Sequence, residues 1–166
     1  MRELILKELR SICQRELASA KEAYESSHDY ATHGEVKSDG KYDTRGIEAG
    51  YLAGAQKRRV LELEGELALL EKLAQEKPTA SDVIAIGSVF EMKSEGGEKN
   101  YFLSPTTGGY QIEIDSQQVL VLGLQSPLGR ETVGLAIGES FEIVVKNVVR
   151  VFEITKLNGA CDESRK

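Results

Sequence analysis

Two stretches in the first half of the chain carry the spacing of amphipathic helices. Between residues 2 and 30 there is no proline or glycine, and apolar side chains recur every three or four positions, at Leu6, Leu9, Cys13, Leu17, Ala20 and Tyr24. Between about residue 42 and residue 76 a coiled-coil stripe appears, made of Val60, Leu63, Leu67, Leu70 and Ala74. Because neither stripe can be buried alone, the pattern predicts a pair of helices over residues 1–77.

The segment between the two helices predicts a turn. It is polar and contains Gly34 and Gly40, and a connection of about ten residues favours an antiparallel hairpin. Thirty helical residues span about 45 Å. The predicted tip, residues 33–43, would therefore lie far from the base of the hairpin.

After residue 77 the pattern changes to that of strands. Pro78 and a polar cluster end the helix and predict a linker over 78–82. Strands are predicted at 83–92, 99–104, 110–115, 117–123, 141–145 and 148–157. Ser126 and Pro127 predict the N-cap and first turn of one short helix that ends at Gly134 or Gly138. The predicted fold class is therefore α+β: a coiled-coil hairpin, a mostly antiparallel β-sheet domain over 83–157 and a polar tail over 158–166.

Composition limits the possible partners. The net charge of the 166 residues is −6, which argues against a protein that binds nucleic acid on its own. Cys13 and Cys161 lie in unrelated contexts and predict neither a metal site nor a disulfide. The start of the chain is charged and no apolar run has membrane-spanning length, so we expect a cytoplasmic protein with no membrane partner.

Residues in the predicted hairpin resemble those of a known family. Gly34 and Gly40 bracket Glu35, Ser38 and Asp39, and carboxylates on such a loop suit a hard cation. The sequence is similar to the Gre family of bacterial transcript-cleavage and elongation factors at residues 33–36 (His-Gly-Glu-Val), Tyr42, Gly54 and residues 62–67 (Glu-Leu-Glu-Gly-Glu-Leu). In an alignment without gaps, the aspartate, glutamate and asparagine of the family's tip fall on Glu35, Ser38 and Asp39.

A second signature lies in the other half of the chain. Residues 126–130 (Ser-Pro-Leu-Gly-Arg), followed by Gly134, Gly138 and Glu139, resemble the signature of the Gre C-terminal domain. The resemblance implies an FKBP-like fold and a polymerase-docking role for Ser126, Pro127 and Arg130. Arg130 can alternatively tie its helix to the sheet. We expect no isomerase activity, because the aromatic residues of this domain are few and several have sheet-core spacing: Phe90, Tyr101, Phe102, Tyr110, Phe141 and Phe152.

The resemblance implies a factor that acts with bacterial RNA polymerase and is not itself an enzyme. In the family the hairpin enters the secondary channel, where two tip carboxylates help hold a second Mg²⁺ for cleavage of backtracked RNA. Here the catalytic and metal-binding roles fall on Glu35 and Asp39, because Ser38 lacks a carboxylate. Mg²⁺ is expected only at the polymerase active site, with no tightly bound cofactor. The alternative is that both acids are solvated, since Lys41 weakens the local negative field.

A basic patch follows on the second helix, formed by Lys57, Arg58 and Arg59. The resemblance implies that it faces the 3′ segment of the RNA and contacts phosphates. An ordinary surface role is the alternative, with Arg58 and Glu62 as an i,i+4 ion pair. His28 and His33 lack the spacing of a zinc site and are expected to be polar surface residues.

Three functional hypotheses follow. The first is an elongation factor that stimulates cleavage by the polymerase. The second is a channel binder without cleavage activity, which competes with cleavage factors. The third is a coiled-coil interaction module unrelated to polymerase. We expect a monomer.

Overall fold

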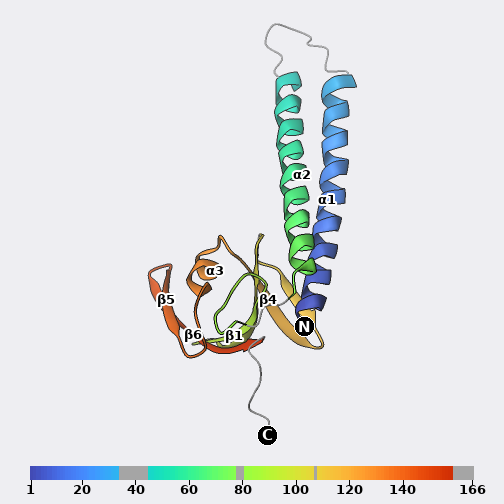
Figure 1. Cartoon of the computed structure of the whole chain (residues 1–166). Coiled ribbons are helices and arrows are strands. Elements are labelled where there is room, and N and C mark those ends of the chain that lie inside the picture. The colour runs from blue at the N-terminus through green and yellow to red at the C-terminus, as the bar shows by residue number, and fades with distance from the viewer. Residues whose placement is uncertain (34–44, 78–80, 107, 159–166) are drawn as a thin grey trace. The chain divides into compact units, whose positions relative to one another are not determined.

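The computed structural model describes residues 1–33, 45–77, 81–106 and 108–158 (Figure 1). They form two compact units. One unit is Leu9–Ala68, and the other combines Met1–Glu8 with Leu69–Lys166. No helix in the described part of the chain is long and apolar enough to span a membrane.

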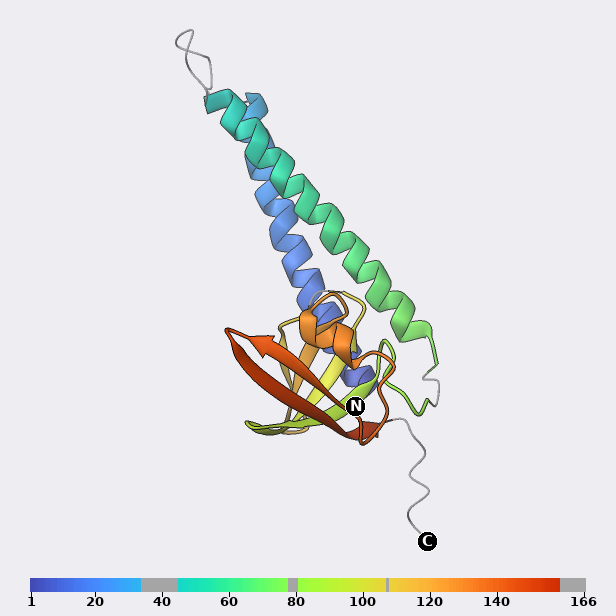
Figure 2. The same ribbon diagram turned by 90° about the vertical axis from the view of Figure 1, so that its left-hand side faces the viewer.

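The unit Leu9–Ala68 is a helical hairpin. Helices α1 (Arg2–His33) and α2 (Arg45–Gln75) run antiparallel and side by side in both views (Figures 1 and 2). Within this unit the buried apolar side chains of the two helices are Leu9, Cys13, Ala20, Ala53, Val60 and Leu63. The predicted hairpin is confirmed, because the stripes of both helices are buried as their spacing requires.

Ion pairs and one buried hydrogen bond link the two helices. Lys21 Nζ lies 2.8 Å from Glu64 Oε1, and Arg59 lies 2.8 Å from Glu16 Oε2. The Cys13 thiol donates to the backbone carbonyl of Leu63 at 3.5 Å. Burial raises the pKa of this thiol, as do Glu66 and Glu16, although Arg59 opposes the shift. Cys13 is therefore a protonated core residue, as the sequence predicted.

The ends of the two helices belong to the unit that contains the sheet. Ile5, Leu6, Leu70 and Leu73 are buried, and Arg2 donates to the Leu73 carbonyl at 2.7 Å. At Gly87, where φ is +86°, an added Cβ would lie 3.1 Å from Leu73 Cδ1. The predicted linker at 78–82 stays a prediction, and residues 78–80 lie outside the described part.

Six strands form one sheet in the order β3-β4-β2-β1-β6-β5. The strands are β1 (Val89–Ser94), β2 (Gly97–Ser104), β3 (Gln111–Ile114), β4 (Gln117–Gly123), β5 (Ser140–Val145) and β6 (Val148–Asn158). Five predicted strands lie within two residues of the observed bounds. The prediction for 83–92 was wrong in its first half, because the left-handed backbone at Gly87 interrupts the extended conformation, and Val83 forms only an isolated bridge to Ala136.

The sheet is mixed, whereas the sequence predicted a mostly antiparallel one. Strands β2 and β4 pair in parallel, with Tyr101 opposite Leu120. The remaining neighbouring strands in the sheet pair antiparallel. The parallel pair arises because the chain passes from β2 to the edge strand β3 and returns through a hairpin, so β4 enters beside β2 in the same direction. Asp115 and Ser116, at φ of 50° and 64°, form the left-handed turn of that hairpin.

Val89, Phe102 and Val119 are buried on one face of the sheet. A second apolar cluster of this unit lies on the other face. It consists of Ile84, Phe90, Met92, Tyr101, Leu103, Ile154 and Leu157. The side chains of Leu128, Leu135, Phe141 and Phe152 pack against it and are partly buried. The rings of Phe90 and Tyr101 stack at 5.9 Å, and those of Phe141 and Phe152 at 5.5 Å. The helix α3 (Pro127–Thr132) contributes Leu128 to this layer.

Candidate functional site

The acids of the predicted tip lie outside the described residues. This applies to Glu35 and Asp39, and also to Ser38 and Lys41. Their metal-binding and catalytic roles therefore stay predictions. Within the described ranges, no group of three His, Cys, Asp or Glu side chains is arranged to hold a metal ion.

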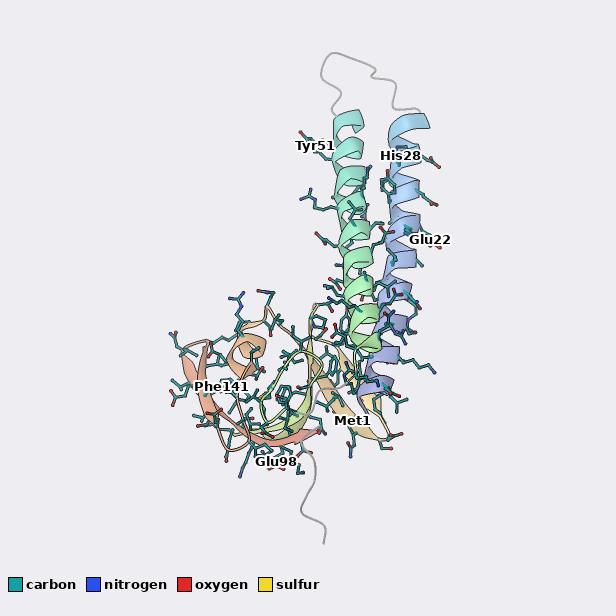
Figure 3. All side chains as sticks on the ribbon, viewed as in Figure 1. Met1, Glu22, His28, Tyr51, Glu98 and Phe141 are labelled. Atoms are coloured by element: carbon teal, nitrogen blue, oxygen red, sulfur yellow. The ribbon has the colours of Figure 1, made fainter. Side chains whose placement is uncertain are left out.

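The hairpin presents two side chains that the heptad analysis did not identify. Tyr51 and Leu52 lie on α2 and are exposed, and Figure 3 shows Tyr51 projecting away from α1. They are not part of the buried stripe, and they lie in the glycine-rich part of the helix. In the sequence, two large apolar side chains in an otherwise polar segment could have indicated this exposed surface. On α1, the ring of His28 contacts that of Tyr24 at 5.6 Å, and His28 is exposed as predicted.

The structure divides the predicted basic patch. Lys57 and Arg58 are exposed on α2, whereas Arg59 is half-buried against Glu16 of α1. Arg59 also lies 3.8 Å from Glu62, so Glu62 pairs with Arg59 rather than with Arg58 as the sequence suggested. The reason is that Arg59 lies closer to the interface between the helices. Lys57 and Arg58 are left as the two members of the patch that face outward.

We expect the Arg59 and Glu16 pair to contribute only modestly to stability. A double-mutant cycle with Arg59→Gln and Glu16→Gln should give a coupling free energy of about 0.5 kcal/mol, because both side chains are partly solvated. Urea unfolding measures it. A coupling free energy near zero would show that the ion pair does not stabilise the hairpin. Arg59 could then exchange Glu16 for a binding partner at little cost in stability.

The Ser-Pro-Leu-Gly-Arg signature forms the start of α3. Ser126 Oγ accepts a hydrogen bond from the Gly129 N–H at 2.9 Å, and Pro127 occupies the first turn. These features confirm the predicted N-cap. The helix ends at Thr132, whose hydroxyl donates to the Gly129 carbonyl at 2.8 Å. Gly134 follows at φ of +82°, close to the predicted stop.

Gly129 is required by close packing. A Cβ at this position would overlap the carbonyl oxygen of Gly123 and lie 2.9 Å from Ser126 Oγ. Gly108 approaches the same segment, since a Cβ there would overlap the Gly123 nitrogen. Gly108 and Gly129 therefore allow the loop before β3 and helix α3 to pack against the backbone at the end of β4.

Arg130 is exposed and lies on the outer side of this motif. Its Nη2 donates to Gln125 Oε1 at 3.3 Å, in the adjoining turn. Among the described residues, no bond ties Arg130 to a strand. The guanidinium group is thus presented to solvent beside the rigid Ser126 and Pro127 backbone.

A cleft of about 930 Å³ opens on the same side of the sheet as the second apolar cluster. Its apolar lining comes from β2, β4, β5, β6 and α3, and includes Tyr101, Leu120, Leu122, Leu128 and Phe152. Ser126 and Pro127 also line it, beside the meeting point of the glycines. Sequence reasoning missed this cleft, because its lining residues come from segments whose pairing is not local.

Two strands of the sheet carry shifted pKa values. Burial raises the pKa of the Tyr101 hydroxyl, which therefore stays protonated at neutral pH. A hydrogen bond of 2.8 Å from Lys156 to Glu91 raises the pKa of Lys156, and the negative charge of Glu91 adds to this shift. This exposed pair bridges β1 and β6, away from the cleft lining.

Comparisons with solved structures find chains that are similar to this one. GreA factor homolog 1 (Gfh1) of Thermus thermophilus is 18% identical, with a TM-score of 0.36, over 90% of this chain and 94% of that one. The GreA/GreB factor of Nitrosomonas europaea is 17% identical, with a TM-score of 0.33, over 62% of this chain and 90% of that one. With these TM-scores the likenesses carry no argument about function.

Sequence comparisons give the clearer result. No family model matches the chain. Transcription elongation factor GreA of Acetivibrio thermocellus is 26% identical over 155 residues, covering 92% of this chain and 86% of the relative. GreA of Jannaschia sp. is 26% identical over 128 residues, covering 76% and 74%. The matches extend over both halves of the chain, so the chain is similar to GreA transcription elongation factors in its helices and in its sheet.

Proposed function

We propose that this protein is a transcription elongation factor that binds bacterial RNA polymerase in the cytoplasm. The observation that carries the proposal is the GreA match over 92% of the chain, because it includes both the hairpin and the sheet. A match limited to the helices would be expected of many coiled coils. A match across both halves favours a shared mode of action.

The hairpin is the part that we propose enters the secondary channel. Its helices of 32 and 31 residues span about 45 Å each, which is enough to carry a tip deep into a partner. Glu35 and Asp39 would lie at the end of that reach. Tyr51 and Leu52 supply exposed apolar surface for contact with the channel wall.

At the polymerase active site, the two tip acids would share a Mg²⁺ ion. Such an ion lowers the pKa of a bound water and stabilises the oxygen that leaves the scissile phosphate. The factor would orient the ion and the water without being an enzyme alone. Lys57 and Arg58 would contact phosphates of the RNA 3′ segment, while Arg59 pairs with Glu16 of α1.

A second candidate function is favoured by the tip sequence. Ser38 stands where the family has a glutamate, and Lys41 adds a positive charge nearby. Both changes reduce attraction for a dication. A protein with these changes would occupy the channel, exclude cleavage factors and leave the backtracked RNA uncut.

Binding to purified RNA polymerase tests the proposal directly. We expect co-elution of the wild-type chain with the core enzyme on size-exclusion chromatography. Arg130→Ala should weaken binding about fivefold to tenfold, because exposed arginines beside rigid backbone are frequent binding hot spots. Lys93→Ala removes a different exposed cation from the sheet and should leave affinity unchanged.

Two results would contradict this account. Absence of any complex would favour the interaction module unrelated to polymerase. Equal losses for Arg130→Ala and Lys93→Ala would show that overall charge, and not the Ser-Pro-Leu-Gly-Arg surface, governs docking.

A further inference from the structure

The cleft on the sheet has the size and chemistry of a small-molecule site. Ligand sites commonly have volumes of about 300–1,000 Å³, an apolar lining and a few polar groups. The cleft has a volume of about 930 Å³, and Leu120, Leu122, Leu128 and Phe152 provide its apolar surface. These residues come from β4, β6 and α3, so the cleft exists only in the folded protein.

Tyr101 supplies a polar group within this apolar surface. Its side chain lines the cleft but is only 5% exposed, and its ring stacks on Phe90. In the described part of the chain, no hydrogen bond engages its hydroxyl. An unpartnered phenol at the wall of a cleft is suited to donate a hydrogen bond to a ligand.

Charged side chains line the cleft as well. Lys99 precedes Tyr101 by two residues on β2, and Arg150 precedes Phe152 by two residues on β6, so each shares a sheet face with its aromatic neighbour. Glu95, in the turn between β1 and β2, is the one acid in the lining. Two cations against one carboxylate favour an anionic ligand.

We propose that this cleft binds a small amphipathic anion, a carboxylate with an apolar body. The body would lie against the leucines and Phe152. The carboxylate would accept a hydrogen bond from Tyr101 and be attracted by Lys99 and Arg150. The proposal does not rest on polymerase binding, although the docking candidates Ser126 and Pro127 also line the cleft.

The test is a titration of the full-length protein with decanoate below its micelle concentration, followed by amide NMR and calorimetry. We expect saturable shifts at Leu120, Leu122 and Leu128. Tyr101→Phe should weaken binding about fivefold, through loss of one hydrogen bond to a charged group. Replacing both cations, with Lys99→Gln and Arg150→Gln, should weaken decanoate binding about tenfold, whereas Glu95→Gln should strengthen it about twofold.

Two controls distinguish specific binding in the cleft from non-specific attraction of the anion to positive charge on the protein. Decanol, the neutral counterpart, should bind equally well to wild type and to the variant lacking both cations. Lys57→Gln with Arg58→Gln removes the same charge from α2 and should leave decanoate affinity unchanged. The proposal is overturned if decanoate gives no saturable shifts, if the shifts lie outside the cleft, or if the α2 variant loses as much affinity as the cleft variant.

Discussion

Replacing Glu35 and Asp39 together with alanine should abolish transcript cleavage. In the first proposed function these are the only two tip carboxylates between Gly34 and Gly40. Their loss would leave the second Mg²⁺ without its ligands from the factor, and we expect cleavage to slow by about 100-fold or more. The measurement is shortening of RNA in a stalled, backtracked elongation complex with saturating protein and Mg²⁺.

A matched control removes two acids near the C-terminal end of α2, outside the hairpin unit. Glu71 and Glu76 are exposed and belong to the other compact unit. Glu71→Ala with Glu76→Ala changes net charge by the same amount as the tip variant and should leave cleavage intact. Binding to polymerase should be unchanged in both double variants.

The opposite outcome would identify the second candidate function. If the wild-type chain produces no shortened transcripts, yet suppresses cleavage by an authentic factor added afterwards, it occupies the channel without the chemistry. Ser38 would then account for the lost activity. Suppression should increase with the concentration of this chain and persist in the tip variant.

Gly129→Ala should cause a large loss of stability. The added Cβ would overlap the carbonyl of Gly123 and crowd Ser126 Oγ, and the overlapped atom is backbone, which cannot rotate away. Overpacking of this kind costs about 1–3 kcal/mol, and we expect the upper end of this range. Chemical denaturation followed by circular dichroism measures the change in the free energy of unfolding.

The same substitution at another glycine should have the opposite sign. Gly65 lies within α2, and an added Cβ there would have no neighbour within 4 Å. Gly65→Ala should therefore stabilise the protein by about 0.5–1 kcal/mol through helix propensity. Equal effects of the two substitutions would show that packing around Gly129 is looser than the structure indicates.

Gly129→Ala also tests whether the Ser-Pro-Leu-Gly-Arg motif serves docking or packing. If the motif serves only docking, polymerase affinity should fall while stability is unchanged. If its glycine serves packing, stability should fall first. Comparison with Arg130→Ala separates the two roles, since Arg130 is exposed and contacts only the side chain of Gln125 among the described residues.

Local sequence patterns were sufficient for the helices, the short helix and most strands. The heptad stripe of α2 and the absence of glycine and proline from most of α1 act within a few residues, as do the Ser126 cap and the turns between strands. Such features depend on neighbours in the chain, and they appear in the structure where they were predicted. The early part of the 83–92 strand was wrong because alternation does not reveal the left-handed backbone of Gly87.

Long-range pairing accounts for what could not be predicted. The parallel register of Tyr101 with Leu120 depends on where β4 enters the sheet, and the ion pair of Arg59 with Glu16 depends on how two helices face each other. The cleft depends on the pairing of several strands and on the packing of a helix against them, since its walls include residues of β2, β4, β5, β6 and α3. Sequence motifs therefore indicated the resemblance to Gre factors and the acids of the predicted tip. Contacts between residues far apart in the chain decide which partners each charged side chain has. They also form the cleft.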